Sequence, residues 1–227
     1  MKPFTVRTIS GVVFVAIMLA GLLVSEKLFG LLVTIMEVGM LYEFYTLPKK
    51  AGKKVSGWNA AAYYPFGTLY IICGMALLYF LSVKDGEFSG ILPLCFFILI
   101  WSSDVGAYCV GSTLGQKLHS RKMAPTLSPN KTWIGFWGGL VFCIVSSVIL
   151  NLCGLLELPL LHCIAFAVVV NCSGVLGDLL ESAWKRFFGV KDSGNLIPGH
   201  GGMLDRFDSS LAAIPFGTMY LLIFNLF

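Results

Sequence analysis

The sequence predicts an all-α integral membrane protein, a polytopic bundle of about seven transmembrane helices with a cytoplasmic N-terminus. Three observations support this fold class. Of 227 residues, 57% are hydrophobic and only 12% are charged, with a mean hydropathy of +0.83. Seven apolar runs approach the ~20 residues that a membrane-spanning helix needs. The basic residues are also distributed very unevenly between these runs, as in polytopic membrane proteins.

The apolar runs are expected to be helices, because they lack the alternation of polar and apolar residues that a barrel strand shows. We expect no cleavable signal peptide, since no small-residue cleavage site and polar mature domain follow the first run. That run is therefore the first predicted span. The seven predicted spans cover roughly residues 9–25, 28–47, 58–81, 90–110, 132–156, 158–180 and 207–227.

The basic residues predict the orientation in the membrane. With seven spans, all 16 Lys and Arg except Lys27 and Lys84 fall on the side of the N-terminus. Cytoplasmic connections carry the excess of Lys and Arg, so this side is predicted to be cytoplasmic. Two long connections, about 111–131 and 181–206, lie on it. We therefore expect residues 1–227 to form a single polytopic domain with its active-site loops at the cytoplasmic face.

Several kinds of site are disfavoured by the sequence. The seven cysteines are scattered in or near apolar spans without a CxxC pair, which indicates packing residues rather than zinc ligands or disulfides. The sequence contains no GxxxxGK[ST] loop, GxGxxG fingerprint, HExxH pair or GxSxG elbow. Acyl transfer by a nucleophilic serine is accordingly disfavoured.

The segment 182–208 concentrates charge and glycine in an otherwise apolar chain. Just before and within it, Asp178, Glu181, Ser182 and Lys185 have the i, i+3, i+4, i+7 spacing of one helix face. An ionised Asp178 beside an apolar run needs compensation. A pair with Lys185 or a bound divalent cation would supply it, and an internal salt bridge that locks helices together is the structural alternative.

A glycine-rich turn at 198–202 precedes the seventh span. Glycine allows positive φ and lets backbone amides approach an anion, and a helix N-terminus also favours negative charge. Asp205 and Asp208 follow at i, i+3, and such carboxylates suit Mg²⁺. This combination predicts a metal–phosphate site. His200 is expected either to contact phosphate or to stabilise the turn, without a role in proton transfer.

Further candidates lie outside this segment. Lys131, at the mouth of the fifth span, can reach a phosphate as a point charge or simply extend to the membrane surface. Asp104 lies inside the fourth predicted span, where an acid is a functional candidate unless it is a satisfied packing group. Glu37 and Glu43 are weaker candidates, and Glu43 is expected to be exposed near the interface.

The spaced pattern S-x-x-K-R-x4-K-D-x5-P-x-H-G-G-x-x-D-R-x-D resembles the signature of the phosphatidate cytidylyltransferases, or CDP-diacylglycerol synthases. Three upstream segments also look like family motifs: Gly177-Asp178-Leu179-x-Glu181-Ser182, Ser128-Pro129-x-Lys131-Thr132 and Asp104-x-x-Ala107-Tyr108-x-x-Gly111. The resemblance covers about residues 100–210. The fixed positions of the longest pattern are Ser182, Lys185, Arg186, Lys191, Asp192, Pro198, His200, Gly201, Gly202, Asp205, Arg206 and Asp208.

The resemblance implies an Mg²⁺-dependent nucleotidyltransferase of phospholipid biosynthesis. Such an enzyme transfers CMP from CTP to phosphatidic acid and gives CDP-diacylglycerol and pyrophosphate. A second metal ion is compatible with it. The implied partners are CTP, phosphatidic acid, membrane lipids and a second copy of the chain in a homodimer, with no nucleic acid. The implied location is the bacterial cytoplasmic (inner) membrane, with the active site facing the cytoplasm.

The resemblance also implies roles for individual residues. Asp178 and Asp205 are the expected principal metal ligands, and Asp208 is a further one. The expected catalytic residues are Asp178, Asp205, Lys185 and Arg206. The expected substrate-binding residues are Lys131, Ser128, Ser182, Arg186, Lys191, His200, Gly201 and Gly202.

Other functions remain compatible with the residues alone. A CTP-dependent polyprenol kinase would release CDP and a phospholipid, and a CDP-archaeol synthase would make a different CDP-lipid. An ion-coupled transporter would also place acids inside spans, but it leaves the dense segment of glycines and bases unexplained. A purely structural membrane protein is the last alternative.

Overall fold

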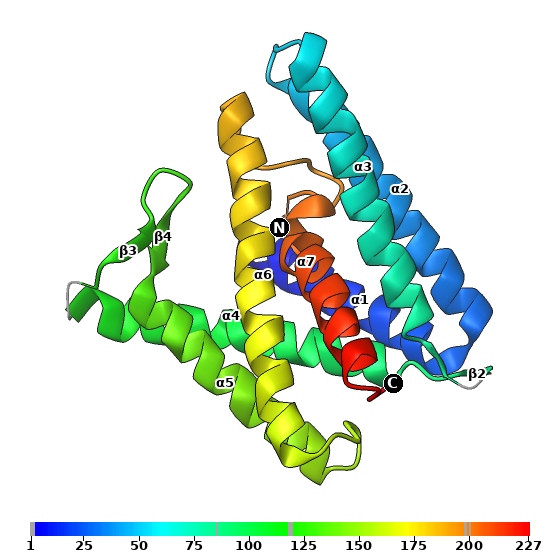
Figure 1. The fold of residues 1–227 in the computed structure, drawn as a ribbon. Helices are drawn as coiled ribbons and strands as arrows, with labels where there is room; N and C mark the ends of the chain where they lie inside the picture. Colours follow the sequence, from blue (N-terminus) through cyan, green and yellow to red (C-terminus); the bar gives the residue numbers. More distant parts are fainter. Residues whose placement is uncertain (1–2, 85, 118–119, 198, 200) are drawn as a thin grey trace.

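The computed structural model describes residues 3–84, 86–117, 120–197, 199 and 201–227. Within these residues it is a bundle of seven α-helices with two small antiparallel hairpins (Figure 1). The hairpins pair β1 (Val83–Lys84) with β2 (Glu87–Phe88), and β3 (Lys122–Ala124) with β4 (Ser128–Thr132). The helices are α1 (Pro3–Val24), α2 (Glu26–Lys50), α3 (Gly57–Phe80), α4 (Ile91–Lys117), α5 (Trp133–Leu152), α6 (Leu160–Phe188) and α7 (Leu204–Ile223).

The predicted fold class is confirmed: the protein is a helical integral membrane protein. In the described part of the chain, five helices are long and apolar enough to cross a membrane, α2 to α6. The apolar part of α1, Thr8–Val24, is shorter, and α7 begins with Asp205, Arg206 and Asp208. The number of helices that cross the membrane and the orientation of the N-terminus stay predictions.

The predicted connections are wrong in detail. Residues 181–188 belong to α6 instead of a loop, α4 continues to Lys117, and 122–132 form a β-hairpin. Hydropathy marks where a helix leaves the apolar layer, whereas hydrogen bonding decides where it ends. Gly189 ends α6 in the left-handed region at φ 76°, and Val190 N donates to Lys185 O at 2.9 Å. This is the ordinary glycine stop of a helix.

Small residues let the central helices approach one another closely. α4 packs along α5, and α6 packs along α7. A Cβ added at Gly138 of α5 would lie 2.5 Å from the Cβ of Val110 in α4, so only glycine fits. Ser103 of α4 donates a buried hydrogen bond of 2.7 Å to Asn171 of α6. These contacts fix α4 beside α6, and thereby place Asp104 near Asp178.

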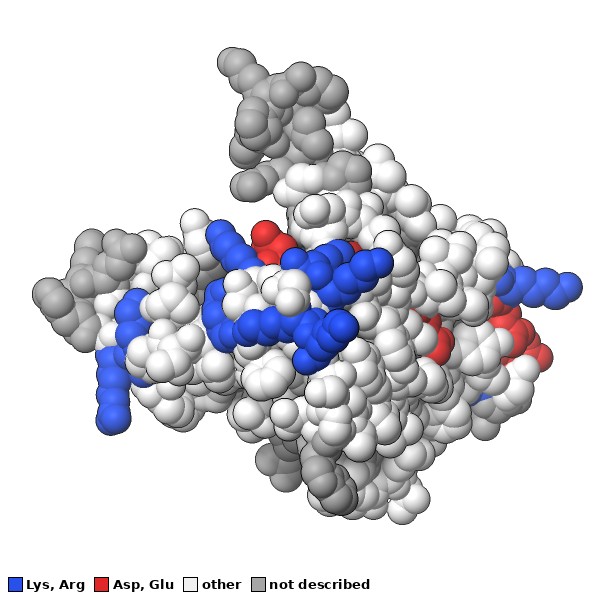
Figure 2. All heavy atoms as spheres, turned by 90° about the horizontal axis from the view of Figure 1, so that it is seen from above, with Lys and Arg blue, Asp and Glu red and all other residues white. Residues whose placement is uncertain are grey.

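One end of the bundle is basic. The C-terminal ends of α2 and α6 point to the top of Figure 1, and the tip of the β3–β4 hairpin points the same way at the left. Figure 2 looks down on this end and shows Lys and Arg gathered over it, with acidic atoms beside them. The exposed basic residues of these segments are Lys49, Lys50, Lys53, Lys54, Arg121, Lys122, Arg186 and Lys191.

Candidate active site

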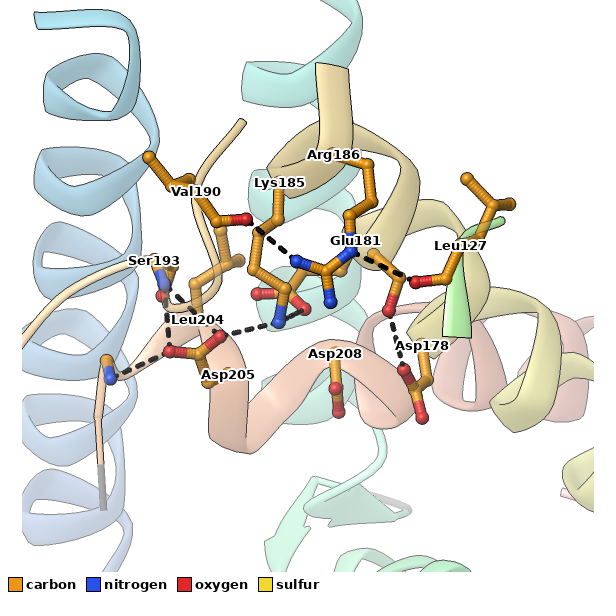
Figure 3. A network of polar contacts seen from close by, with 12 residues as sticks. Leu127, Asp178, Glu181, Lys185, Arg186, Val190, Ser193, Leu204, Asp205 and Asp208 are labelled. Carbon is orange, nitrogen blue, oxygen red and sulfur yellow. Dashed lines mark hydrogen bonds and ion pairs between the residues drawn. The ribbon is translucent and has the colours of Figure 1, made fainter. Parts of the chain in front are cut away.

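An ion pair joins the β3–β4 hairpin to α6. Lys131 Nζ of β4 lies 2.6 Å from Asp178 Oδ2 of α6, and Ser182 Oγ donates to Asp178 Oδ1 at 3.3 Å (Figure 3 shows the second contact). The shared helix face of Asp178, Glu181, Ser182 and Lys185 is confirmed. The suggested Asp178–Lys185 pair is wrong, because Lys185 is held by other acids and the hairpin supplies the cation.

Lys185 lies between two carboxylates in a largely buried network. Its Nζ is 2.7 Å from Asp205 Oδ1 and also pairs with Glu181 Oε2. The side chains of Glu181, Asp205 and Lys185 retain only 2%, 7% and 12% of their exposure. Breaking a buried pair leaves an uncompensated charge, which costs several kcal/mol. Lys185 therefore holds the start of α7 against the end of α6.

Asp205 organises the connection between α6 and α7. Its Oδ2 accepts hydrogen bonds from Ser193 N at 3.0 Å and Gly202 N at 2.9 Å. Together with Lys185, three donors thus occupy this carboxylate. The predicted positive-φ turn is confirmed, since Gly199 has φ 76° and Gly201 has φ 87°. Pro198 and His200 lie outside the described residues.

Arg186 joins the hairpin to the same connection. Its Nε donates to Leu127 O at 3.2 Å, and its Nη1 donates to Val190 O at 3.0 Å (Figure 3). The side chain is exposed, as is Lys191 farther along the connection. Ser128, half-buried, begins β4. The phosphate-binding roles of Arg186, Lys191 and Ser128 stay predictions.

Two cavities meet at Asp104 and Asp178. The smaller, about 410 Å³, is lined by these two residues, by Asp205, Arg206 and Asp208 of α7, and by residues of α1 that include Phe14. The larger, about 810 Å³, lies on the other side and is lined by α4, α5 and the β3–β4 hairpin, including Lys131. Asp104, predicted as an intramembrane candidate, thus lies at the junction and is accessible.

The donor set suits a hard cation only in part. Among the residues that the structure describes, no three His, Cys, Asp or Glu side chains form a ready-made metal site. Mg²⁺, however, typically takes one or two carboxylates and completes its shell with waters and phosphates. Asp178 and Asp208 line one cavity and lie beside each other in Figure 3. They fit such a site, whereas Asp205 is committed to its three donors.

The expectation that Glu43 is exposed near the interface is wrong. The residue is fully buried, with 0% exposure. Its Oε2 accepts from Ser193 Oγ at 3.2 Å and from Leu204 N at 2.9 Å. A signal existed: Glu43 follows Met40 by three residues and precedes Leu47 by four, and both are buried. It therefore lies on the apolar face of α2.

These features define a helical integral membrane protein with a polar site, lined by carboxylates and lysine, where α4, α6, α7 and the β3–β4 hairpin meet. The chain belongs to the cytidylyltransferase family, whose model matches residues 53–224. This match confirms the resemblance found in the sequence and includes every described residue of the site except Glu43 and the part of α1 that lines the smaller cavity.

Individual relatives agree with this assignment. The chain is 40% identical to the phosphatidate cytidylyltransferase of Bacillus subtilis over 174 residues, 76% of this chain and 62% of that protein. It is 32% identical to that of Rickettsia bellii over 215 residues, 92% of this chain and 87% of the relative. The matches to the Bacillus and Staphylococcus epidermidis relatives span 62% and 55% of those longer proteins.

Proposed function

We propose that this protein transfers CMP from CTP to phosphatidic acid, giving CDP-diacylglycerol and pyrophosphate. The observation that carries the proposal is the junction of the two cavities at Asp104 and Asp178, next to Lys131. A transfer between two phosphate-bearing substrates needs two adjoining spaces and a shared reaction point between them. The names of the relatives support the same reaction.

The reaction needs no nucleophilic side chain. A phosphate oxygen of phosphatidic acid attacks the α-phosphorus of CTP, the bond from that phosphorus to the bridging oxygen breaks, and pyrophosphate leaves. The main barrier is the approach of several negative charges, so catalysis consists of alignment and charge neutralisation. Lys131 supplies a point charge at the junction, and Arg206 supplies a second one from the smaller cavity. Lys185 keeps α7 in register with α6.

The linings of the cavities suggest which substrate each one takes. The larger cavity combines Lys122, Asn130 and Lys131 with the glycines of α4 and α5, which suits a nucleoside triphosphate. The smaller cavity adds the apolar side chains Phe14 and Trp101 to its charged end. This mixture suits a lipid phosphate with its first acyl carbons.

Asp178 and Asp208, with Asp104 at the junction, are the residues that would hold Mg²⁺. When bound, the ion would neutralise phosphate oxygens and polarise the phosphorus under attack. Asp205 stays a proposed ligand from the sequence, but its contacts favour ordering the connection. A second metal ion is also part of the proposal, and Asp205 lines the same cavity.

The remaining assignments concern binding and location. We propose that Ser128, Ser182, Arg186, Lys191, His200 and the Gly201–Gly202 backbone contact the substrates. The basic end of the bundle supports a cytoplasmic active site in a bacterial inner membrane, since CTP is cytosolic. Membrane lipids surround the protein, and a homodimer remains part of the proposal.

One incubation tests the function. The purified full chain is combined with CTP, phosphatidic acid and Mg²⁺, and the lipid and nucleotide products are identified by mass spectrometry. CDP-diacylglycerol and pyrophosphate are expected. In a parallel incubation with a polyprenol in place of phosphatidic acid, release of CDP with a newly phosphorylated polyprenol would establish the kinase instead. Ion uptake into proteoliposomes without CTP turnover would establish a transporter.

A further inference from the structure

Glu43 contacts the active-site connection from outside the matched family segment. It lies on α2, 150 residues before Ser193 and 161 before Leu204, yet its Oε2 accepts from Ser193 Oγ and from Leu204 N. Ser193 lies within the connection that follows the end of α6 at Phe188, and Leu204 is the first residue of α7. One carboxylate on a separate helix therefore ties the connection to the start of α7.

Two glycines make room for this carboxylate. A Cβ added at Gly194 would lie 2.0 Å from Glu43 Oε1, and one at Gly202 would lie 2.4 Å from Glu43 Oε2. Neither position has space for any side chain. The connection is therefore shaped around Glu43, which gives Gly202 a packing role besides the backbone approach expected from the sequence.

Glu43 and Asp205 accept hydrogen bonds from the same two parts of the connection. Asp205 accepts from the backbone of Ser193 and Gly202, while Glu43 accepts from the side chain of Ser193 and the backbone of Leu204. Lys50, also on α2, donates to Ser193 O at 2.9 Å. Ser193 is thus fixed through its amide, carbonyl and hydroxyl groups, and α2 supplies two of these contacts.

We propose that Glu43 is a positioning residue for the reaction: it sets the positions of Ser193 and Leu204 and thereby of Asp205 and Arg206. This inference rests on the proposed cytidylyl transfer for its catalytic part only. A carboxylate that caps Leu204 N also fixes the first turn of α7, where free amides need an acceptor. The remaining oxygen, Oε1, is buried and has no hydrogen-bond partner among the described residues.

Because Glu43 Oε2 accepts both hydrogen bonds, variants that keep or remove this acceptor can test its role. Glu43→Gln keeps a carbonyl oxygen for Leu204 N and nearly the same volume, whereas Glu43→Ala removes the acceptor. Ser193→Ala removes only the hydroxyl that donates to Glu43 Oε2 and leaves Glu43 in place. It is the substitute variant if Glu43→Ala does not fold. Glu37→Gln is the matched control, because Glu37 lies on the same helix but lines a separate cavity with Glu26 and Tyr79.

Hydrogen–deuterium exchange tests the positioning without any assay of activity. In Glu43→Ala, or in Ser193→Ala if needed, amides of 193–204 should exchange about tenfold faster, because the connection opens more often. Peptides of α5 should be unchanged, as should all peptides of Glu37→Gln. Glu43→Gln should remain close to the parent protein. Unchanged exchange at 193–204 in Glu43→Ala, or in Ser193→Ala where Glu43→Ala does not fold, would overturn the inference.

Kinetics test the consequence for the reaction. We expect Glu43→Ala to lower kcat/KM for CTP about 30-fold, with a rise in KM, because small misplacements cost up to ~100-fold. A loss of folded protein alone would lower the maximal rate without changing KM. If Glu43→Gln is as impaired as Glu43→Ala, the charge matters rather than the hydrogen bond, and positioning by hydrogen bonding is refuted. A parent protein without cytidylyl transfer would refute the proposed function, while the exchange result would still decide the role of Glu43.

Discussion

Lys131 Nζ and Asp178 Oδ2 lie 2.6 Å apart, and their ion pair joins the β3–β4 hairpin to α6. Their side chains keep 23% and 28% of their exposure, so both can exchange this contact for another partner. Asp178 lines both cavities, and Lys131 lines the larger one. Each charge neutralises the other in this pair, and in the proposed reaction Lys131 would turn to a phosphate and Asp178 to a cation.

Replacement of Lys131 should impair the reaction more than it impairs the fold. We expect Lys131→Met to lower kcat/KM by about 100-fold, the usual effect of removing one group that stabilises developing charge. Thermal unfolding in detergent should change little, because a partly exposed ion pair contributes only ~1 kcal/mol or less. Lys84→Met in the β1–β2 hairpin is the control. A rate near that of the parent protein would remove Lys131 from the mechanism.

Asp178 should be required for metal-dependent turnover. Asp178→Asn keeps the size of the side chain and can still accept from Ser182, but it loses the negative charge. We expect a fall in kcat of about 10³-fold at fixed Mg²⁺, as for a group that acts in the transition state. Glu87→Gln, exposed in β2, is the control. A folded Asp178→Asn protein with an ordinary rate would exclude Asp178 as a ligand.

Metal removal should abolish activity reversibly. Treatment with excess EDTA should stop CDP-lipid formation, and added Mg²⁺ should restore it, because carboxylates and phosphates together form the expected site. Asp208→Asn should raise the Mg²⁺ concentration for half-maximal rate by about tenfold or more, equivalent to ~1.4 kcal/mol. Asp205→Asn should change this concentration less, since Asp205 already has three donors. The opposite ranking would make Asp205 the principal ligand.

Gly202 should not tolerate a side chain. A Cβ there would lie 2.1 Å from Ser193 Oγ and 2.4 Å from Glu43 Oε2, so the connection must shift in Gly202→Ala. Such overpacking costs about 1–3 kcal/mol, and we expect a lower thermal midpoint together with lower activity. Gly174→Ala is the comparison, because its Cβ would meet its nearest neighbour at an ordinary 3.7 Å. Equal midpoints for the two variants would contradict this prediction.

Periodic and local features were predictable from the sequence. Long apolar runs produced helices near the expected places, because the thickness of the apolar layer sets their length. The spacing from Asp178 to Lys185 correctly indicated one helix face, since 3.6 residues per turn leave no other arrangement. The positive φ of Gly199 and Gly201 followed from the glycine-rich turn. The family resemblance likewise depended only on residue spacing.

Partners far apart in the chain were decided by the tertiary structure alone. The helix spacing offered Lys185 as one possible partner of Asp178. Because α7 packs against α6, Lys185 instead pairs with Asp205, and Lys131 of the hairpin pairs with Asp178. Glu43 was predicted to be an exposed interfacial acid. It is instead buried and accepts a hydrogen bond from Ser193, 150 residues later in the chain. Spacing along one helix reveals which side chains share a face. Which face meets which neighbour depends on how all the helices pack, and a single stretch of sequence does not contain that information.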